Sequence, residues 1–375
     1  MKTLFDIKID FEKSQGSFLF DKKRQAPFLD LFSLYSSLPL GYNHPVFDQS
    51  FRDKVLRVCN LRMTNNMFWS DELLEFMEHF SEVVPSKNIH LTCTGALAIE
   101  SAIKCALDYK RSKIPMILSL KKSFHGINSW GFLTDRFAAT EARMEWVPRN
   151  NWQNLSLEEM LQYFETQDLS NLAAIVIEPI QSTAGDVYVP PDQLKKIENL
   201  CRQNDVCLIF DEIQTGFGAT GSMWYHQKIN ITPDILVFGK KAQVCGLVAN
   251  DKYSGCLKSS VQKLEVTYDG DLIDAIRSTY VLKAYKKWDL LSQASKNSDC
   301  FRQILSPRFE NYRSCGHLIA FDFTDKNSRD AFAKNCFDKG VLVNGSGEKS
   351  IRLRPNMAIS QNEIDFFEQK LKDIL

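Results

Sequence analysis

The middle of the chain alternates short apolar runs with segments in which apolar residues recur every three or four positions. Residues 157–164 show this helical spacing behind a capping box at Ser156–Glu159. The strand-like runs AAIVIEP (173–179) and VCLIFDE (206–212) flank a second helical pattern at 194–201. Strand, helix and strand in this order predict a mostly parallel sheet with helices on both faces.

The pattern changes near residue 270. A long helical segment is followed there by the strand-like runs HLIAFDF, VLVNG and SIRLRP, by a helix near Ser328 and by a capped C-terminal helix. We therefore expect an α/β fold with a large domain at residues 46–270 and a small α+β domain at 271–375. The N-terminal segment, 1–45, is expected to pack with the small domain.

Composition and charge narrow the range of functions that the chain can have. The 375 residues exceed the usual size of a single core, in line with two domains. The 46 basic and 46 acidic residues balance, which favours small molecules or other protein chains as partners over nucleic acid or a membrane. The chain shows neither a signal peptide nor an apolar stretch that could span a bilayer. Its ten cysteines lack metal or redox spacings, so we expect reduced thiols and a cytoplasmic protein.

Three apolar runs end in a charged residue, namely Glu178, Asp211 and Lys240. Because ligands of parallel α/β sheets bind beyond the carboxyl ends of the strands, all three side chains are candidates to line one crevice. A structural ion pair explains any one of them about as well. It explains three of them less well, because buried charges are costly.

A glycine before a helix adds a candidate phosphate site. In TGALAIESAIKCALDYK, Gly95 precedes a helical pattern whose free N–H groups and positive dipole end suit an anion, although such a glycine is often only a turn. A lysine, a carboxylate and a phosphate site together suit pyridoxal phosphate. Its aldehyde condenses with a lysine, its ring nitrogen needs a carboxylate, and its phosphate needs an anion site.

Two other motifs are similar to those of nucleotide-binding proteins. LIFDE is similar to a strand of nucleotide hydrolases, but Gly239-Lys240 lacks the glycine five residues upstream that their phosphate loop requires. GFGATG, with Gly216, Gly218 and Gly221, has the spacing of a dinucleotide fingerprint. It does not lead straight from a strand into a helix, so we interpret it as a turn.

Several motifs in order resemble one family. IFDEIQTGFGATG, IEPIQ and PDILVFGKKAQVCG are similar to motifs of the class III (ω-amino acid) pyridoxal-phosphate aminotransferases, and most closely to those of L-lysine 6-aminotransferases. The similarity extends to FLDLFSLYSSLPLG, TGALAIESAIKCALDYK, SFHG, VTYDGDLIDAIR and SIRLRP. The resemblance implies a fold-type I transferase, normally a homodimer with shared active sites. It also implies ping-pong transfer of an amino group between a small-molecule donor and an oxo acceptor.

The resemblance also implies roles for cofactor-binding residues. The Schiff-base lysine of this family lies six residues after an aspartate, which here is the spacing from Asp234 to Lys240 and makes Lys241 a neighbour that faces elsewhere. Lys240 also serves as general base and acid. By the same resemblance, Asp211 is expected to pair with the ring nitrogen and Gln214 to lie near the phenolic oxygen. Gly95 and Ala96 are expected to bind the phosphate and Phe124 to stack on the ring. Thr267 is expected to reach the phosphate that the partner subunit holds.

For substrates, the resemblance makes Arg352 the residue that binds the α-carboxylate of glutamate or 2-oxoglutarate. Glu178 neutralises it when the other substrate is bound, and Arg354 shares the face of Arg352 on the predicted strand. One position departs from the pattern. Lysine 6-aminotransferases have an arginine after Phe-His-Gly for the α-carboxylate of lysine, whereas this chain has Ile127.

The resulting hypothesis is an aminotransferase that moves an ω-amine in the manner of lysine 6-aminotransferases, with glutamate and 2-oxoglutarate as the other pair. The Ile127 change favours a carbonyl substrate without the lysine carboxylate. Two alternatives stay open. One is a decarboxylase, mutase or racemase on the same scaffold, and the other is a non-catalytic binding or regulatory protein with a relic site.

Overall fold

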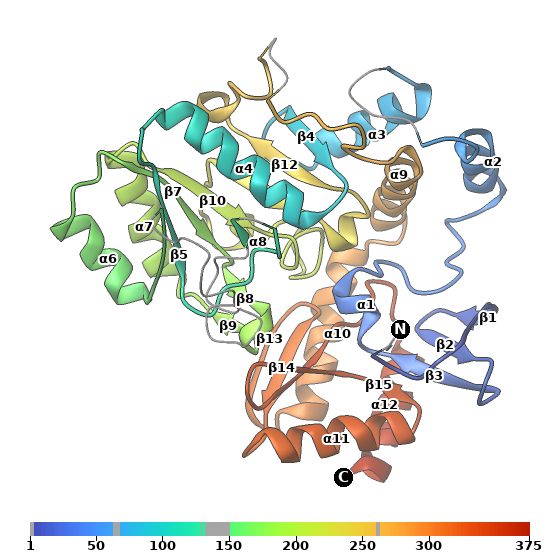
Figure 1. Ribbon diagram of the computed structural model, residues 1–375. Helices are drawn as coiled ribbons and strands as arrows, with labels where there is room; N and C mark the ends of the chain where they lie inside the picture. Colours follow the sequence, from blue (N-terminus) through green and yellow to red (C-terminus); the bar gives the residue numbers. More distant parts are fainter. Residues whose placement is uncertain (1–3, 63–67, 129, 132–150, 260–262) are drawn as a thin grey trace. The chain divides into compact units, whose positions relative to one another are not determined.

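The computed structural model describes residues 4–62, 68–128, 130–131, 151–259 and 263–375 (Figure 1). The chain divides into two compact units. The larger comprises residues 54–217 and 222–279, and the smaller joins the N-terminal residues up to 53 with 218–221 and 280–375.

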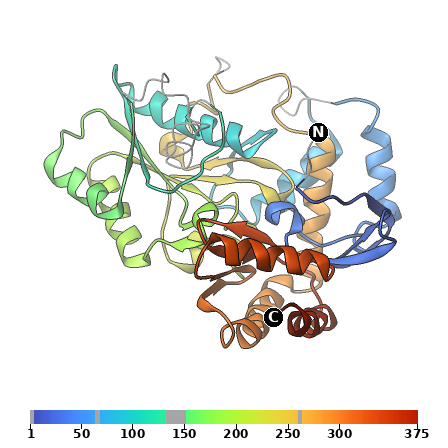
Figure 2. The ribbon, with the colours of Figure 1, turned by 60° about the horizontal axis from the view of Figure 1, so that its bottom comes forward.

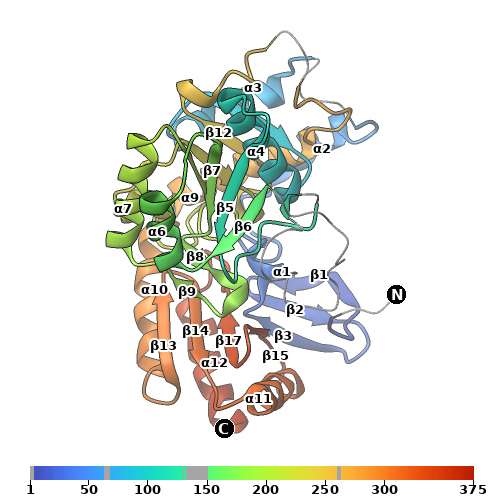
Figure 3. The same ribbon diagram turned by 60° about the vertical axis from the view of Figure 1, so that its left-hand side comes forward.

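A seven-stranded sheet forms the core of the larger unit (Figure 3). Its strands lie in the order β4 (Asn88–Thr92), β12 (Cys245–Ala249), β11 (Ile235–Phe238), β10 (Cys207–Asp211), β7 (Leu172–Ile177), β5 (Met116–Leu120) and β6 (Trp152–Leu155). From β11 to β6 the neighbours are parallel, and β12 runs antiparallel to both β11 and β4. The predicted mostly parallel sheet is therefore confirmed.

Helices cover both faces of this sheet, as predicted. Helix α4 (Gly95–Lys110) lies on one face, and α6 (Leu157–Thr166) and α7 (Pro191–Gln203) lie on the other (Figure 1). Val176 of β7 packs on the α4 side, whereas its neighbour Ile175 packs on the side of α6 and α7. Because both of their faces are buried, the central strands β7 and β11 are apolar at every position instead of alternating.

Shorter elements complete the larger unit. They are α3 (Asp71–Ser81), β8 (Ile180–Gln181), β9 (Val187–Tyr188), α8 (Tyr225–Lys228) and three single turns at Ser182–Ala184, Lys240–Ala242 and Asp251–Tyr253. Helices α2 (Gln49–Val58) and α9 (Leu272–Lys287) each cross the boundary between the units. In the described part of the chain, no helix is long and apolar enough to cross a membrane.

The smaller unit contains two four-stranded sheets. One has the order β1 (Ile9–Gln15), β2 (Phe18–Asp21), β3 (Ala26–Asp30) and β15 (Val341–Leu342), and the other β13 (Glu310–Cys315), β14 (Leu318–Asp322), β17 (Ser350–Leu353) and β16 (Asn344–Ser346). Helices α10 (Leu290–Leu305), α11 (Lys326–Asp338) and α12 (Gln361–Ile374) pack against one face of the second sheet (Figure 2).

The run VLVNG forms two strands, where the sequence predicted one. Val341–Leu342 pairs in parallel with β3, and Asn344–Ser346 pairs in an antiparallel way with β17. The run therefore passes from one sheet to the other, because each half finds its hydrogen-bonding partners in a different strand. The pairing of β15 with β3 joins the N-terminal segment to the C-terminal part of the chain.

Candidate active site

Glu178, Asp211 and Lys240 lie at one edge of the seven-stranded sheet. Glu178 follows β7, Asp211 ends β10, and Lys240 follows β11 after Gly239. Because these three strands are parallel neighbours, their carboxyl ends meet at the same edge. All three residues line one pocket with a cavity volume of about 310 Å³, which is in the size range of small-molecule sites.

Most of the predicted cofactor residues line this same pocket. They are Gly95, Ala96, Phe124, Asp211, Gln214 and Lys240. They come from the start of α4, from the loop after β5, and from the loops after β10 and β11. Segments that are more than 100 residues apart in the sequence are therefore brought together by the order of strands in the sheet.

The two adjacent lysines differ in their surroundings. Lys240 lines the pocket, whereas Lys241 is 2% exposed and does not. Lys240 has φ of 50°, in the left-handed region that costs a non-glycine residue about 1–2 kcal/mol. Such strain is typical of functional sites, and here the backbone turns sharply between the end of β11 and the single turn Lys240–Ala242.

Asp211 is held by two contacts in a buried environment. Its Oδ2 lies 2.9 Å from Nδ1 of His125, and its Oδ1 accepts a hydrogen bond of 3.1 Å from the backbone N–H of Ile213. His125 is fully buried, and its Nε2 has no hydrogen-bond partner among the described residues. The carboxylate is thus fixed in orientation at the end of β10.

Glu178 ties the Phe-His-Gly loop to the strand ends. Its Oε1 accepts a hydrogen bond of 2.7 Å from the backbone N–H of Phe124. Burial raises the pKa of Glu178 to about 7, since His125, the Phe124 N–H and Lys240 offset the desolvation only in part and Asp211 adds to it. A carboxyl with this pKa changes charge readily when a nearby cation or ligand comes or goes.

The start of α4 is shaped to receive an anion. Thr94 caps the helix, its Oγ1 accepting from the N–H of Leu97 at 3.2 Å. A Cβ on Gly95 would lie 2.7 Å from the Cδ1 of Ile213, so the backbone of Gly95 is in close contact with the side chain of Ile213. Gly126 has φ of +98°, and a Cβ there would lie 2.7 Å from the Cβ of Ala96. The Phe-His-Gly loop therefore packs directly on the first turn of α4, beside the N–H groups that suit a phosphate.

Thr267 and Arg352 do not line this pocket. Thr267 is exposed in the loop that precedes α9. Arg352 belongs to the smaller unit, where Ile351 and Leu353 face the helices and Arg352 therefore faces the opposite side of its sheet. Its guanidinium lies 5.9 Å from the ring centre of Tyr35.

Arg354 differs from Arg352 in its contacts. It is 1% exposed, and its Nη1 donates to the carbonyl oxygens of Leu353 at 2.9 Å and Ile319 at 3.3 Å. Its guanidinium is therefore engaged with the backbone of the smaller unit.

Sequence reasoning missed several residues of the pocket. Gly126 lines the pocket and stands inside the Phe-His-Gly motif, so the motif itself was a signal for it. The same motif holds His125, which does not line the pocket but contacts Asp211. Thr183, Ile213 and Cys245 also line the pocket. Nothing in their sequence spacing indicates this, because each reaches the pocket from a turn or strand start whose course depends on the fold.

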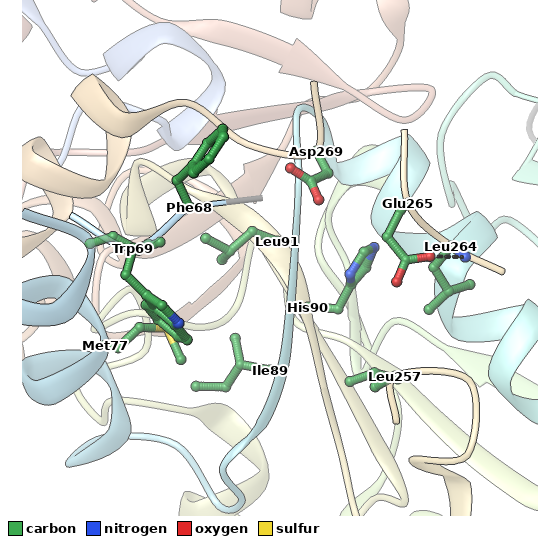
Figure 4. Close-up of a pocket in the computed structure, with 11 residues that line it drawn as sticks. Phe68, Trp69, Met77, Ile89, His90, Leu91, Leu257, Leu264, Glu265 and Asp269 are labelled. Carbon is green, nitrogen blue, oxygen red and sulfur yellow. Dashed lines mark hydrogen bonds between the residues drawn. The ribbon is translucent and has the colours of Figure 1, made fainter. Parts of the chain in front are cut away.

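A second cavity in the larger unit, of about 370 Å³, lies beside the edge strand β4 (Figure 4). Trp69, Met77, Ile89 and Leu91 gather on one side of the strand, and His90 points to the other side, toward Glu265. Among the described residues that line it, the ionisable side chains are His90, Glu265 and Asp269, and none is a lysine. Carboxylates repel a phosphate, so this cavity does not suit the cofactor although it is the larger of the two.

The strand-end lysine, the buried aspartate and the glycine-containing helix start fit pyridoxal phosphate in charge and position. They form the candidate site for this cofactor on an α/β transferase fold. The chain belongs to the class III aminotransferase family, whose model, "Aminotransferase class-III", matches residues 3–375. It is therefore a pyridoxal-phosphate-dependent transaminase that acts on a small-molecule amino donor and an oxo acceptor.

Relatives and solved structures agree with this family. The chain is 28% identical to the L-lysine-epsilon aminotransferase of Streptomyces clavuligerus, over 96% of this chain and 89% of that protein. It is 26% identical to the 4-aminobutyrate aminotransferase of Schizosaccharomyces pombe, over 98% and 89%. The structure of the lysine aminotransferase of M. tuberculosis matches it with a TM-score of 0.92 at 27% identity, over 100% of this chain and 96% of the other.

Proposed function

We propose that Lys240 holds the cofactor and moves the proton in both half-reactions. Pyridoxal phosphate supplies an electron sink for the substrate carbon that bears the amine. Lys240 lines the pocket at the sheet edge, so its amine would act there as general base and then as general acid. The observation that carries the proposal is the presence of Lys240, Asp211 and the start of α4 in one pocket.

The other pocket residues are assigned by their positions. Asp211, oriented by His125, favours a proton on the ring nitrogen, because a negative charge raises the pKa of a neighbouring base. Gln214 is assigned to the phenolic oxygen and Phe124 to the ring face, since both line the pocket. Gly95 and Ala96 hold the phosphate with their N–H groups.

We further propose glutamate and 2-oxoglutarate as one substrate pair. The planar guanidinium of Arg352 matches a carboxylate with two parallel hydrogen bonds, and Arg354 is already engaged with carbonyl oxygens. Glu178 is proposed to neutralise Arg352 when the other substrate is bound. A double-mutant cycle with Arg352→Gln and Glu178→Gln tests this pairing. Losses that simply add, within about 0.5 kcal/mol, contradict it.

The other substrate is proposed to be an ω-amine or its aldehyde, as the names of the lysine aminotransferases suggest, but without a carboxylate near residue 127. Ile127 lines the pocket and is 65% exposed. An isoleucine offers apolar contact and no partner for a charge, so burying a carboxylate against it is unfavourable.

The active enzyme is proposed to be a homodimer in which Thr267 of one chain reaches the phosphate of the other. Thr267 is exposed in this chain, and the neighbouring side chains of Val266 and Tyr268 are exposed apolar groups, as are those of Phe68 and Trp69. Apolar groups gathered in this way are typical of protein interfaces. The ten cysteines are free, which supports the proposed cytoplasmic location.

The test is the visible absorbance of the purified protein with pyridoxal phosphate, before and after L-glutamate is added. A yellow band that L-glutamate bleaches is the expected result. A yellow band that L-glutamate leaves unchanged removes glutamate as donor and keeps the decarboxylase, mutase or racemase alternative. A protein that forms no yellow band has a relic site, in contradiction to the proposed function.

A further inference from the structure

We propose that Thr183 selects the substrate by binding an uncharged hydrogen-bonding group, such as a hydroxyl or an amide, at the end of the substrate distant from the amine. The inference rests on the proposed function. Thr183 stands in the single turn Ser182–Ala184 after β8 and lines the pocket that holds Lys240. Its Oγ1 is buried and has no hydrogen-bond partner among the described residues.

The turn that carries Thr183 is held at both ends. Before the turn, the Nε2 of Gln181 donates to the carbonyl oxygen of Lys121 at 2.7 Å. After it, Gly185 adopts a φ of +99°, which ends the turn in a conformation that suits glycine. A buried hydroxyl without a hydrogen-bond partner is unfavourable. A ligand group in the pocket that hydrogen-bonds to Oγ1 would relieve this cost.

The other polar side chains of the pocket are already occupied or assigned. Lys240, Asp211 and Gln214 are assigned to the cofactor, and the Oε1 of Glu178 accepts from the Phe124 N–H. Thr183 is therefore the pocket hydroxyl that stays available to a substrate.

The charge of the pocket limits the class of ligand. Among the described lining residues, Lys240 is the one cation, and Ile127 and Ile213 add apolar surface. Lys240 is assigned to the cofactor and Arg352 to the carboxylate of glutamate, so the described lining of this pocket offers no further basic side chain for a carboxylate on the distal end of the other substrate. A neutral polar end fits better, and the class of substrate is therefore an ω-amino alcohol or ω-amino amide and the corresponding aldehydes.

Stable conjugates test the inference by binding alone. Reductive coupling of pyridoxal phosphate to aminopentanol, pentylamine or aminopentanoate gives three ligands that differ only at the distal end. Calorimetric titration of the cofactor-free protein is expected to show the alcohol conjugate bound at least about tenfold more tightly than the alkyl one, equivalent to about 1.4 kcal/mol. The carboxylate conjugate is expected to bind more weakly than the alcohol.

Two variants test whether the preference for the alcohol conjugate comes from the hydroxyl of Thr183. Thr183→Val replaces it with a methyl group of similar volume, and the alcohol-to-alkyl ratio is expected to fall to within about threefold of one. Thr183→Ser keeps the hydroxyl and is expected to keep at least half of the preference on a logarithmic scale. An unchanged ratio in Thr183→Val overturns the inference, and so does a wild-type protein with no preference.

Turnover separates this inference from the proposed function. If L-glutamate bleaches the wild-type cofactor but the three conjugates bind alike, the role of Thr183 is wrong and the transaminase activity stands. If L-glutamate has no effect while the alcohol conjugate is preferred, the donor assignment is wrong and the Thr183 subsite stands. The ratio of kcat/KM for aminopentanol and pentylamine provides the kinetic form of the same comparison.

Discussion

The Nδ1 of His125 lies 2.9 Å from the Oδ2 of Asp211, and both side chains are buried at the carboxyl edge of the central sheet. His125 precedes Asp211 by 86 residues. The contact joins the Phe-His-Gly loop to the end of β10, and it holds the carboxylate in one orientation. Asp211 is therefore a preorganised negative charge, which is more effective than a mobile one.

Removal of the Asp211 charge is expected to slow the half-reaction with L-glutamate at least about 100-fold, in the range of a lost acid–base function. Asp211→Asn keeps the shape and removes the charge that favours a proton on the ring nitrogen. Stopped-flow bleaching of the cofactor measures the effect. Asp192→Asn, at an exposed position of α7, is the control and is expected to match the wild type. His125→Ala is expected to cost about tenfold alone and little in addition to Asp211→Asn.

The two adjacent lysines are expected to behave differently. Borohydride reduction of the protein with bound cofactor, followed by peptide mapping, is expected to find the pyridoxyl group on Lys240. Lys240→Ala is expected to lose the yellow band and to reduce turnover by a factor of at least about 1,000. Lys241→Met keeps a side chain of similar length at a buried position and is expected to keep the band. A label on Lys241 contradicts the assignment.

A methyl group at residue 126 is expected to weaken cofactor binding. Gly126→Ala places a Cβ 2.7 Å from that of Ala96 and at a φ of +98°, so the loop must move away from the helix start. We expect at least a tenfold rise in the Kd for pyridoxal phosphate and a loss of about 1–3 kcal/mol in the free energy of unfolding. Fluorescence titration and urea unfolding measure the two effects.

Gly255→Ala is the matched control for this change. Its nearest atom, Oδ2 of Asp108, would lie 3.6 Å from the new Cβ, an ordinary contact. Equal losses of cofactor affinity in the two variants contradict a specific role for the packing of Gly126 on Ala96.

The stability of the cofactor-free protein is expected to fall as the pH rises from about 4.5 to about 7. Burial raises the pKa of Glu178 from 4.5 to about 7, so the folded protein binds this proton more tightly than the unfolded chain does. The resulting contribution is complete below pH 4.5 and is lost as the pH rises to about 7, on the order of 1–3 kcal/mol. Glu178→Gln cannot ionise and keeps an acceptor for the Phe124 N–H. Urea unfolding is therefore expected to show a shallower pH dependence in this variant than in the control Glu158→Gln, at an exposed position of α6.

Ile127→Arg is expected to raise kcat/KM for L-lysine at least about tenfold. A guanidinium at this pocket position can pair with the α-carboxylate that isoleucine cannot bind. Ile127→Leu adds no charge and is the control for a change of side chain at the same site. Equal lysine activity in the two variants shows that residue 127 does not set this specificity.

Much of the larger unit could be predicted from the sequence. Strand β7 is continuously apolar and β10 is apolar up to Asp211, because helices bury both of their faces. The capping boxes of α6 and α12 form as their residues indicate. Glu178, Asp211 and Lys240 could be placed at one edge because strand direction in a βαβ arrangement is predictable. The motifs that resemble those of class III aminotransferases supported the prediction that the cofactor is pyridoxal phosphate.

The remaining features of the site depend on contacts between residues that are far apart in the sequence. The contact of Gly126 with Ala96, the 2.9 Å approach of His125 to Asp211 and the hydrogen bond from Phe124 to Glu178 each join different loops. The buried hydroxyl of Thr183 has no sequence signal, because a threonine in a turn is ordinary. The division of VLVNG between two sheets depends on which strands lie beside each half.

The sequence by itself determined the elements, the alternation of strands and helices, and the presence of a lysine, an aspartate and a helix start suited to one cofactor. These follow from local periodicity and from residue chemistry, which act over a few positions along the chain. Only the tertiary structure decided that His125 contacts Asp211 and that the buried hydroxyl of Thr183 lies beside the pocket. The physical reason is that side-chain orientation, burial and hydrogen bonding are set by packing between segments far apart in the chain.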